Sequence, residues 1–131
     1  MVWASPGIHH GKIYDESMCV LGMAEELKAD GIAVNGLWPR TAIATAAVKN
    51  VLGGEELMNI SRKPEIMADA AYEIFIKDSK EFTGNFCIDD LVLHESGVKD
   101  FTNYADVSFD KLAPDFFVPD DTPVPEEIKN S

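Results

Sequence analysis

The residues best suited to chemistry are three histidines and a pair of adjacent aspartates. His9 and His10 are neighbours, His94 lies far along the chain, and Asp89 is followed directly by Asp90. Neighbouring side chains on a helix point about 100° apart, so His9 and His10 are poorly placed to share a metal ion. Adjacent acids after a strand usually form a turn. We therefore predict no metal site, and we interpret Asp89-Asp90 as a turn.

Composition narrows the classes of function that the chain can have. It holds 131 residues with a formal net charge of −12, and 46% of the residues are hydrophobic. An acidic surface opposes binding to nucleic acids and to anionic membrane surfaces. The two cysteines, Cys19 and Cys87, fit no metal-ligand spacing. Because no apolar run approaches the ~20 residues of a membrane span and no signal-peptide pattern is present, we predict a soluble, cytoplasmic domain.

Apolar residues at helical spacing predict the first regular element. They recur at three-residue steps, with Val20 beside them: Met18, Leu21, Ala24 and Leu27. Charged residues fall on the other side, so the pattern predicts an amphipathic helix over 15–29. Two runs, 32–38 and 83–89, predict short strands. The first is continuously apolar, which is typical of a central strand in a parallel sheet.

Helices are expected between the two strands. Residues 42–52 are helix-prone, 55–61 fits one further turn of helix, and Pro64 begins an amphipathic helix that ends near Lys77. A strand–helix–strand connection of this length is how parallel strands are joined. Two strands are too few for a stable open sheet, so we predict one end of a larger α/β domain. Its missing neighbours would leave an aggregation-prone edge near Ile32–Trp38.

Proline and acidic residues dominate the end of the chain. Residues 91–97 fit a short helix or a loop, and the composition changes after about Ala105. We predict a mostly irregular tail over 106–131. Four aromatic residues could hold parts of it against a surface: Phe101, Tyr104, Phe116 and Phe117. The predicted organisation is a lead over 1–14, a domain portion over 15–105 and this tail.

Several runs resemble the short-chain dehydrogenase/reductase family. They are 18–27, 31–41, 64–71, 82–86 and 114–117. The run Val34-Asn35-Gly36-Leu37-Trp38-Pro39-Arg40-Thr41 is fairly specific to one subgroup, and Thr83-Gly84-Asn85-Phe86 is a variant of a pattern common in the family. The resemblance implies the C-terminal portion of a Rossmann-type parallel sheet, of which this chain supplies the last two strands. It also implies an NAD(P)-dependent oxidoreductase that acts on a small carbonyl or alcohol.

The same resemblance implies a cofactor-binding loop after the first strand. In such enzymes this loop lies against the nicotinamide, and its backbone and a threonine bind the carboxamide. The matching residues are Pro39, Thr41, Ile43 and Thr45. This placement agrees with the rule that ligands bind at the carboxyl ends of parallel strands. An alternative interpretation is that Thr41 only caps the following helix.

The family's catalytic pair, Tyr-x-x-x-Lys, is missing at the matching place. Counting back from Met18 puts the tyrosine position at His9 and the lysine position at Ile13, while Tyr14 has Met18 four residues later. Ile13 carries no charge, so it cannot lower the pKa of a proton donor. The Gly-rich phosphate turn is also absent. We therefore predict no catalytic residue and no turnover, and we expect the chain alone to bind no NAD(P), or none tighter than millimolar.

A shifted reading frame would account for the missing pair. With permitted codons for Ile8 to Ile13, moving the frame by one base encodes Tyr-Thr-Met-Ala-Lys. We therefore hypothesise a local frameshift before Asp15 in a truncated short-chain dehydrogenase/reductase. The alternative is a non-catalytic remnant that forms a homodimer, or another interaction, through the helix over 15–29.

Overall fold

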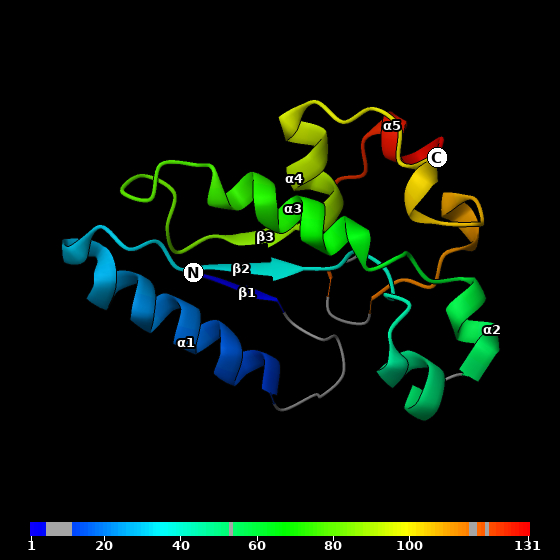
Figure 1. The fold of residues 1–131 in the computed structure, drawn as a ribbon, viewed down its shortest axis with the longest axis horizontal. Helices are drawn as coiled ribbons and strands as arrows, with labels where there is room; N and C mark the ends of the chain where they lie inside the picture. Colours follow the sequence, from blue (N-terminus) through cyan, green and yellow to red (C-terminus); the bar gives the residue numbers. More distant parts are fainter. Residues whose placement is uncertain (5–11, 53, 116–117, 120) are drawn as a thin grey trace.

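The structure, a computed structural model, describes residues 1–4, 12–52, 54–115, 118–119 and 121–131. Its centre is one sheet of three parallel strands in the order β1-β2-β3 (Figure 1). The strands are β1 (Val2–Ala4), β2 (Asn35–Trp38) and β3 (Phe86–Ile88). In the register, Gly36 of β2 lies between Trp3 and Phe86. β2 is therefore the central strand, with a hydrogen-bonded neighbour on each side.

Both predicted strands are present, although each is shorter than the run that predicted it. The three-residue strand β1 was not predicted, because residues 1–14 show no strand pattern of their own. Its pairing with β2 makes one expectation wrong: the segment near Ile32–Trp38 is not an unpaired edge. β2 is almost continuously buried, as expected for a central parallel strand covered on both faces.

Helices cover both faces of the sheet. In Figure 1, α1 (Lys12–Leu27) lies on one side, and α3 (Glu65–Phe75) and α4 (Asp89–Ser96) lie on the other. Each face has its own apolar cluster. Leu37 of β2 belongs to the larger one, with buried residues of α3 and α4, and Val34 packs against α1 in the smaller one. This three-layer arrangement is the α/β architecture that the alternating pattern predicts.

The helix predicted over 15–29 is present as α1, but only part of its expected apolar face is buried. Val20 and Ala24 are buried against Val34, whereas Met18 and Leu21 are 67% and 47% exposed. The apolar residues of this helix therefore extend onto its outer side. A 3-10 turn over Lys28–Asp30 continues the helix to the left-handed Gly31.

The middle of the chain is helical as predicted, with shifted bounds. A π-helical turn (Val48–Leu52) and α2 (Gly54–Asn59) follow β2, and Pro64 stands at the N-terminus of α3. One interpretation is wrong: Asp89-Asp90 is not a turn but the first turn of α4. Asp89 Oδ1 accepts the Asp90 N–H at 2.8 Å, and acidic side chains at a helix N-terminus are stabilised by the free N–H groups there.

The tail has little regular structure but folds back onto the domain. It contains a 3-10 turn (Phe109–Lys111) and α5 (Glu126–Lys129). Leu112 and Ile128 are buried, and Ile128 joins the same apolar cluster as Phe101. Phe101 is buried as expected for an anchor. Phe116 and Phe117 lie outside the described residues.

Candidate functional site

The predicted cofactor loop, residues 39–45, leaves the carboxyl end of the central strand β2. It runs extended between two other segments. Thr41 forms an antiparallel bridge with Pro114, and Ile43 forms a parallel bridge with Arg62. This pairing explains why the helix predicted from residue 42 begins only near residue 46. All four predicted site residues therefore lie on one extended segment at the edge where α/β sheets bind ligands.

Hydrogen bonds fix this segment from both sides. The Ala42 N–H donates to the Ala113 carbonyl at 2.9 Å, and the Ala42 carbonyl accepts the Arg62 N–H at 2.8 Å. The Ala44 N–H donates to the Arg62 carbonyl at 2.8 Å. Because these bonds use Ala42 and Ala44, the peptide groups of Ile43 face away from Arg62. Within the described part of the chain, neither the N–H nor the carbonyl of Ile43 makes a hydrogen bond.

The four predicted residues differ in their exposure to solvent. Pro39 and Thr41 are buried, Ile43 is half-buried and Thr45 is exposed. The Thr45 hydroxyl accepts the Val48 N–H at 3.4 Å, so Thr45 caps the following helix. The capping interpretation of Thr41 is therefore wrong. Its hydroxyl lies 3.5 Å from the Ala42 carbonyl, at the outer limit of a hydrogen bond.

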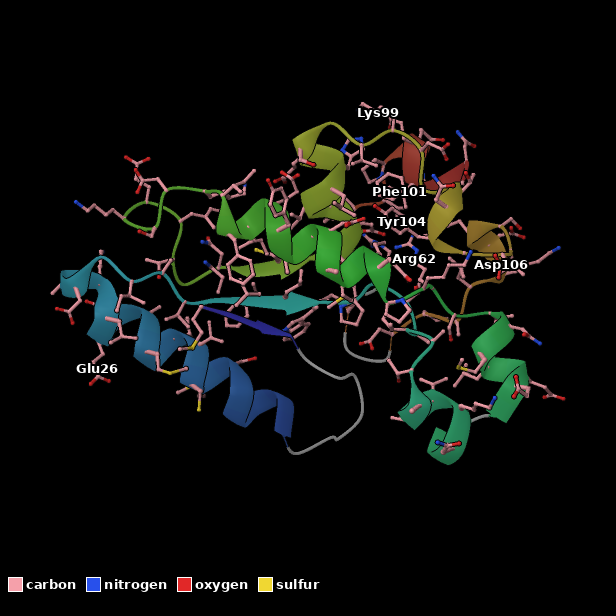
Figure 2. The ribbon with its side chains drawn as sticks, viewed as in Figure 1. Glu26, Arg62, Lys99, Phe101, Tyr104 and Asp106 are labelled. Atoms are coloured by element: carbon pink, nitrogen blue, oxygen red, sulfur yellow. The ribbon has the colours of Figure 1, made fainter. Side chains whose placement is uncertain are left out.

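A buried cluster of four charged side chains adjoins the loop. Its members are Arg40, Arg62, Asp89 and Asp90. Arg40 Nε donates to both carboxylate oxygens of Asp90, at 2.9 and 2.7 Å, and Arg62 Nη1 donates to Asp90 Oδ2 at 2.8 Å. Asp89 Oδ1 accepts the backbone N–H of Arg40 at 3.0 Å. Figure 2 shows Arg62 beyond the tip of β2, on the side of the tail. Arg62, Asp89 and Asp90 are at most 1% exposed.

The tail joins this cluster through two further contacts. Arg40 Nη2 donates to the Pro123 carbonyl at 2.9 Å. The Arg62 guanidinium lies 5.6 Å from the centre of the Phe109 ring, within range of a cation–π interaction. The cluster therefore connects the end of β2, the start of α4 and the tail.

Burial changes the protonation of Asp89. Loss of solvent raises its pKa to about 7, and the charge of neighbouring Asp90 adds to the rise, while Arg62 and the N–H groups of Arg40 and Asp90 oppose it. Asp89 Oδ2 and Arg62 Nη2 have no hydrogen-bond partner among the described residues. Near neutral pH the Asp89 carboxyl is thus poised between its acid and its anion.

The charged cluster was not predicted from the sequence. Arg40 and Arg62 are distant from Asp89 in sequence, and no spacing rule brings them together. The one available signal was that an acidic pair directly follows a buried strand, where a helix begins. Charged residues are rarely fully buried unless they are paired, so their burial became evident only from the tertiary structure.

The histidines form no metal site in the described residues, where no group of three His, Cys, Asp or Glu side chains is arranged to hold an ion. His94 Nε2 instead lies 3.2 Å from Glu127 Oε2, and Lys99 Nζ lies 3.3 Å from Glu127 Oε1. The pair of His94 connects α4 to α5, and the pair of Lys99 connects the segment after α4 to α5. His9 and His10 lie outside the described residues, as does most of the segment on which the frameshift hypothesis depends.

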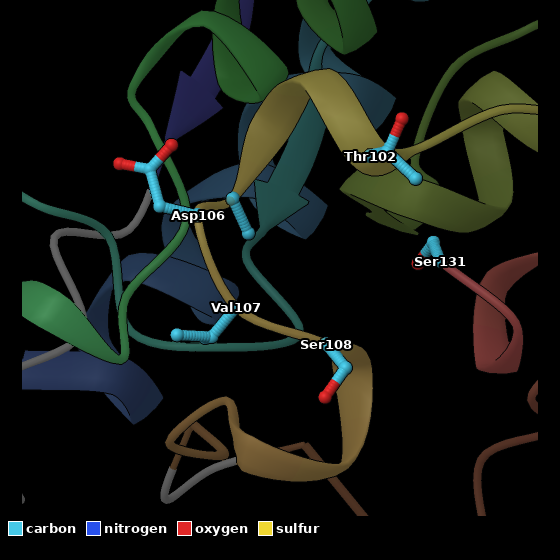
Figure 3. Close-up of a pocket in the computed structure, with 6 residues that line it drawn as sticks. Thr102, Asp106, Val107, Ser108 and Ser131 are labelled. Carbon is cyan, nitrogen blue, oxygen red and sulfur yellow. The ribbon is translucent and has the colours of Figure 1, made fainter.

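A shallow pocket of about 220 Å³ lies near the tail (Figure 3). It is lined by Thr102, Ala105, Asp106, Val107, Ser108 and Ser131. Its polar side chains are engaged locally: Thr102 donates to Asp100 at 2.6 Å, and Asp106 pairs with Lys63 at 2.7 Å. None of the predicted cofactor-loop residues lines it. In the described helices, none is long and apolar enough to cross a membrane.

Known proteins resemble this chain over most of its length. No family model matches it. Hydroxysteroid dehydrogenase-like protein 2 of Mus musculus is 53% identical over 118 residues, which are 90% of this chain and 24% of the relative. The Homo sapiens protein of the same name is 54% identical over 105 residues. The chain thus spans about a quarter of the length of these curated relatives.

Two solved structures share both fold and sequence with the chain. A short-chain dehydrogenase of Mycobacterium thermoresistibile superposes with a TM-score of 0.74 at 49% identity, over 90% of this chain and 41% of that one. A putative dehydrogenase from Xanthomonas campestris gives a TM-score of 0.70 at 42% identity, over 79% of this chain and 37% of that one. With its parallel sheet and its covering helices, the chain belongs to the short-chain dehydrogenase/reductase family.

Proposed function

We propose that this chain forms the nicotinamide-binding side of an NAD(P)-dependent oxidoreductase that acts on a small carbonyl or alcohol. The observation that carries the proposal is the open peptide edge of Ile43. It lies at the carboxyl end of the central strand, and its N–H and carbonyl make no hydrogen bond with the described residues. The chain alone is proposed to have no turnover, because neither Ile13 nor Met18 supplies the lysine of the family's catalytic pair.

The loop residues fit the chemistry of a nicotinamide carboxamide. A primary amide offers one carbonyl acceptor and one NH₂ donor. The Ile43 N–H and carbonyl supply the matching donor and acceptor. The Thr45 hydroxyl uses a lone pair for the Val48 N–H, so its own proton stays available for a ligand. When bound, the nicotinamide carries the hydride. The loop would orient the nicotinamide ring, and the buried Pro39 and Thr41 would form the start of that loop beneath it.

A titration followed by NMR tests this proposal. The ¹⁵N-labelled chain would be titrated with NADH and NADPH, with ATP as the control because it lacks nicotinamide. We expect dissociation constants no tighter than about 1 mM, with amide shifts centred on Ile43 to Thr45. Ile43→Pro removes the donor N–H and should abolish these shifts. Equal shifts with ATP, shifts away from the loop, or tighter binding would contradict the proposal.

A second candidate function is homodimerisation through the outer side of α1. The observation in its favour is that Met18 and Leu21 are exposed on one helix, because burying both would remove apolar surface from water. Light scattering coupled to size-exclusion chromatography tests it. A salt-insensitive dimer that Met18→Glu disrupts would support this role. The matched control is Tyr72→Glu on α3, which is 62% exposed. A monomer, or equal disruption by both variants, would contradict it.

A further inference from the structure

Asp90 connects the two arginines that border the candidate cofactor loop. Arg40 stands at the start of the loop, and both carboxylate oxygens of Asp90 accept its Nε–H. Arg62 pairs with the loop through its backbone bridge to Ile43, and its Nη1 donates to Asp90 Oδ2 at 2.8 Å. With both arginines bound to one carboxylate, their separation is fixed by the position of Asp90 at the start of α4.

The backbones of the same two arginines hold the loop in place. The Arg62 N–H donates to the Ala42 carbonyl, and the Arg62 carbonyl accepts the Ala44 N–H, each at 2.8 Å. The Arg40 carbonyl accepts the Asp115 N–H at 2.9 Å. Side-chain pairing with Asp90 therefore determines where these backbone partners lie. The N–H and the carbonyl of Ile43, which form its open peptide edge, lie between Ala42 and Ala44. The direction in which these two groups point therefore depends on the same contacts.

Stability alone does not account for this cluster. Taking four ionisable side chains out of water costs several kcal/mol per ion, and replacement by apolar residues of similar volume is often neutral or stabilising. Arg62 Nη2 and Asp89 Oδ2 also have no partner among the described residues. A buried carboxylate that accepts hydrogen bonds from two guanidinium groups does, however, specify direction more strictly than apolar packing. Such a cluster is suited to fixing the geometry of a neighbouring site.

We propose that Asp90 is a positioning residue for the nicotinamide loop. Acting through Arg40 and Arg62, it keeps the segment 40–44 extended and the peptide edge of Ile43 open. This inference rests on the proposed function for its consequence in cofactor binding. The positioning of the loop itself can be measured separately.

Hydrogen exchange in a matched pair of variants tests the positioning. Asp90→Asn replaces an acceptor oxygen by an NH₂ group that faces two arginines. Asp89→Asn is the control, because it keeps the Oδ1 acceptor and changes only the unpartnered Oδ2. The loop amides to follow are Ala42, Ala44 and Asp115. The reference amides are Gly36 and Gly84, which donate to the Asn85 and Val34 carbonyls.

We expect Asp90→Asn to accelerate exchange of the loop amides by roughly tenfold or more, with little change at the reference amides. At about pH 5, where the Asp89 carboxyl is protonated and as neutral as the asparagine amide, Asp89→Asn should leave both sets unchanged. Equal acceleration of loop and reference amides would mean that Asp90 serves overall stability only, and would overturn the inference. Equal loosening of the loop by Asp89→Asn would overturn the assignment to Asp90.

The NADH titration of the same variants separates this inference from the proposed function. We expect the shifts at Ile43 to weaken in Asp90→Asn and to persist in Asp89→Asn. If the wild-type chain shows no such shifts, the proposed function fails, while the exchange data still decide whether Asp90 positions the loop. If the loop loosens in Asp90→Asn but the NADH response is unchanged, positioning of the cofactor site is refuted and the proposed function stands.

A milder variant covers the case in which Asp90→Asn does not fold. Arg40→Lys keeps the positive charge, but one ammonium cannot reproduce the contacts of the guanidinium with both Asp90 and Pro123. We expect faster exchange at Asp115 and Ala42 than at Gly36. Unchanged exchange at Asp115 and Ala42 would contradict the inference.

Discussion

The Asp89 side chain should make the stability of this protein depend on pH in an unusual direction. Burial raises the pKa of its carboxyl to about 7 in the folded chain, against 3.8 for an ordinary aspartate. The folded state therefore binds a proton that the unfolded state releases between pH 4 and 7. The stabilisation is complete below the unfolded pKa and is lost as the pH rises through the folded pKa. Across this window it amounts to about 4 kcal/mol.

Asp89→Asn isolates this effect. The asparagine keeps an acceptor for the N–H groups of Arg40 and Asp90, and it carries no charge at any pH. Near pH 4 the variant and the wild type should have similar free energies of unfolding. Near pH 8 the variant should be more stable, by up to about 4 kcal/mol, because only the wild type carries the buried anion.

Urea unfolding followed by circular dichroism at pH 5, 6, 7 and 8 would measure the difference. The control is Asp100→Asn, at an exposed carboxyl whose pKa is lowered by hydrogen bonds from Thr102. Stability from Asp100 is lost only as the pH falls through that lowered pKa, so its variant should show no added slope above pH 5. A flat difference between wild type and Asp89→Asn, or a less stable Asn variant at pH 8, would refute the reasoning.

Three further predictions concern the tail, the thiols and Tyr104. Ile128→Ala, at a fully buried tail residue, should lower the free energy of unfolding by about 2–5 kcal/mol in urea titrations; an unchanged midpoint would mean that the tail is not docked. Cys19 is exposed, whereas burial of Cys87 raises its thiol pKa, so a disulfide reagent should label Cys19 first; equal rates would contradict this packing. Burial and the hydrogen bond to Asp69 raise the pKa of Tyr104 to about 12, so Tyr104→Phe should remove a tyrosine titration at about pH 12 from the ultraviolet absorbance; an unchanged curve would argue against the contact.

The strands and helices were predictable where the pattern is local. The run 32–38 is mostly apolar, as expected for a strand that helices cover on both faces. The run 83–89 holds fewer apolar residues, and Phe86 in β3 is exposed. β1 was not predictable, because three residues acquire strand geometry only by pairing with β2. The outer apolar residues of α1, Met18 and Leu21, satisfy the same periodicity as its buried face, so spacing alone could not tell which side packs.

The place of the candidate loop at the carboxyl end of a strand was predictable, but its contacts were not; its role in cofactor binding stays a prediction. The resemblance placed the loop over 39–45, and the structure brings those residues onto one segment. Which threonine caps the next helix depends on where the extended segment ends, and that point is set by pairing with Arg62 and Ala113. The pairing of Asp90 with two arginines depends on contacts between distant segments, and no local pattern encodes it.

The most direct test of the proposed role is the contact between the loop and the nicotinamide ring. Intermolecular nuclear Overhauser effects would be recorded on the labelled chain with saturating NADH. We predict cross-peaks between the Ile43 amide proton and the nicotinamide protons, which Ile43→Pro removes. Cross-peaks from the nicotinamide to other parts of the chain, with none to residues 39–45, would contradict the proposed role of this loop.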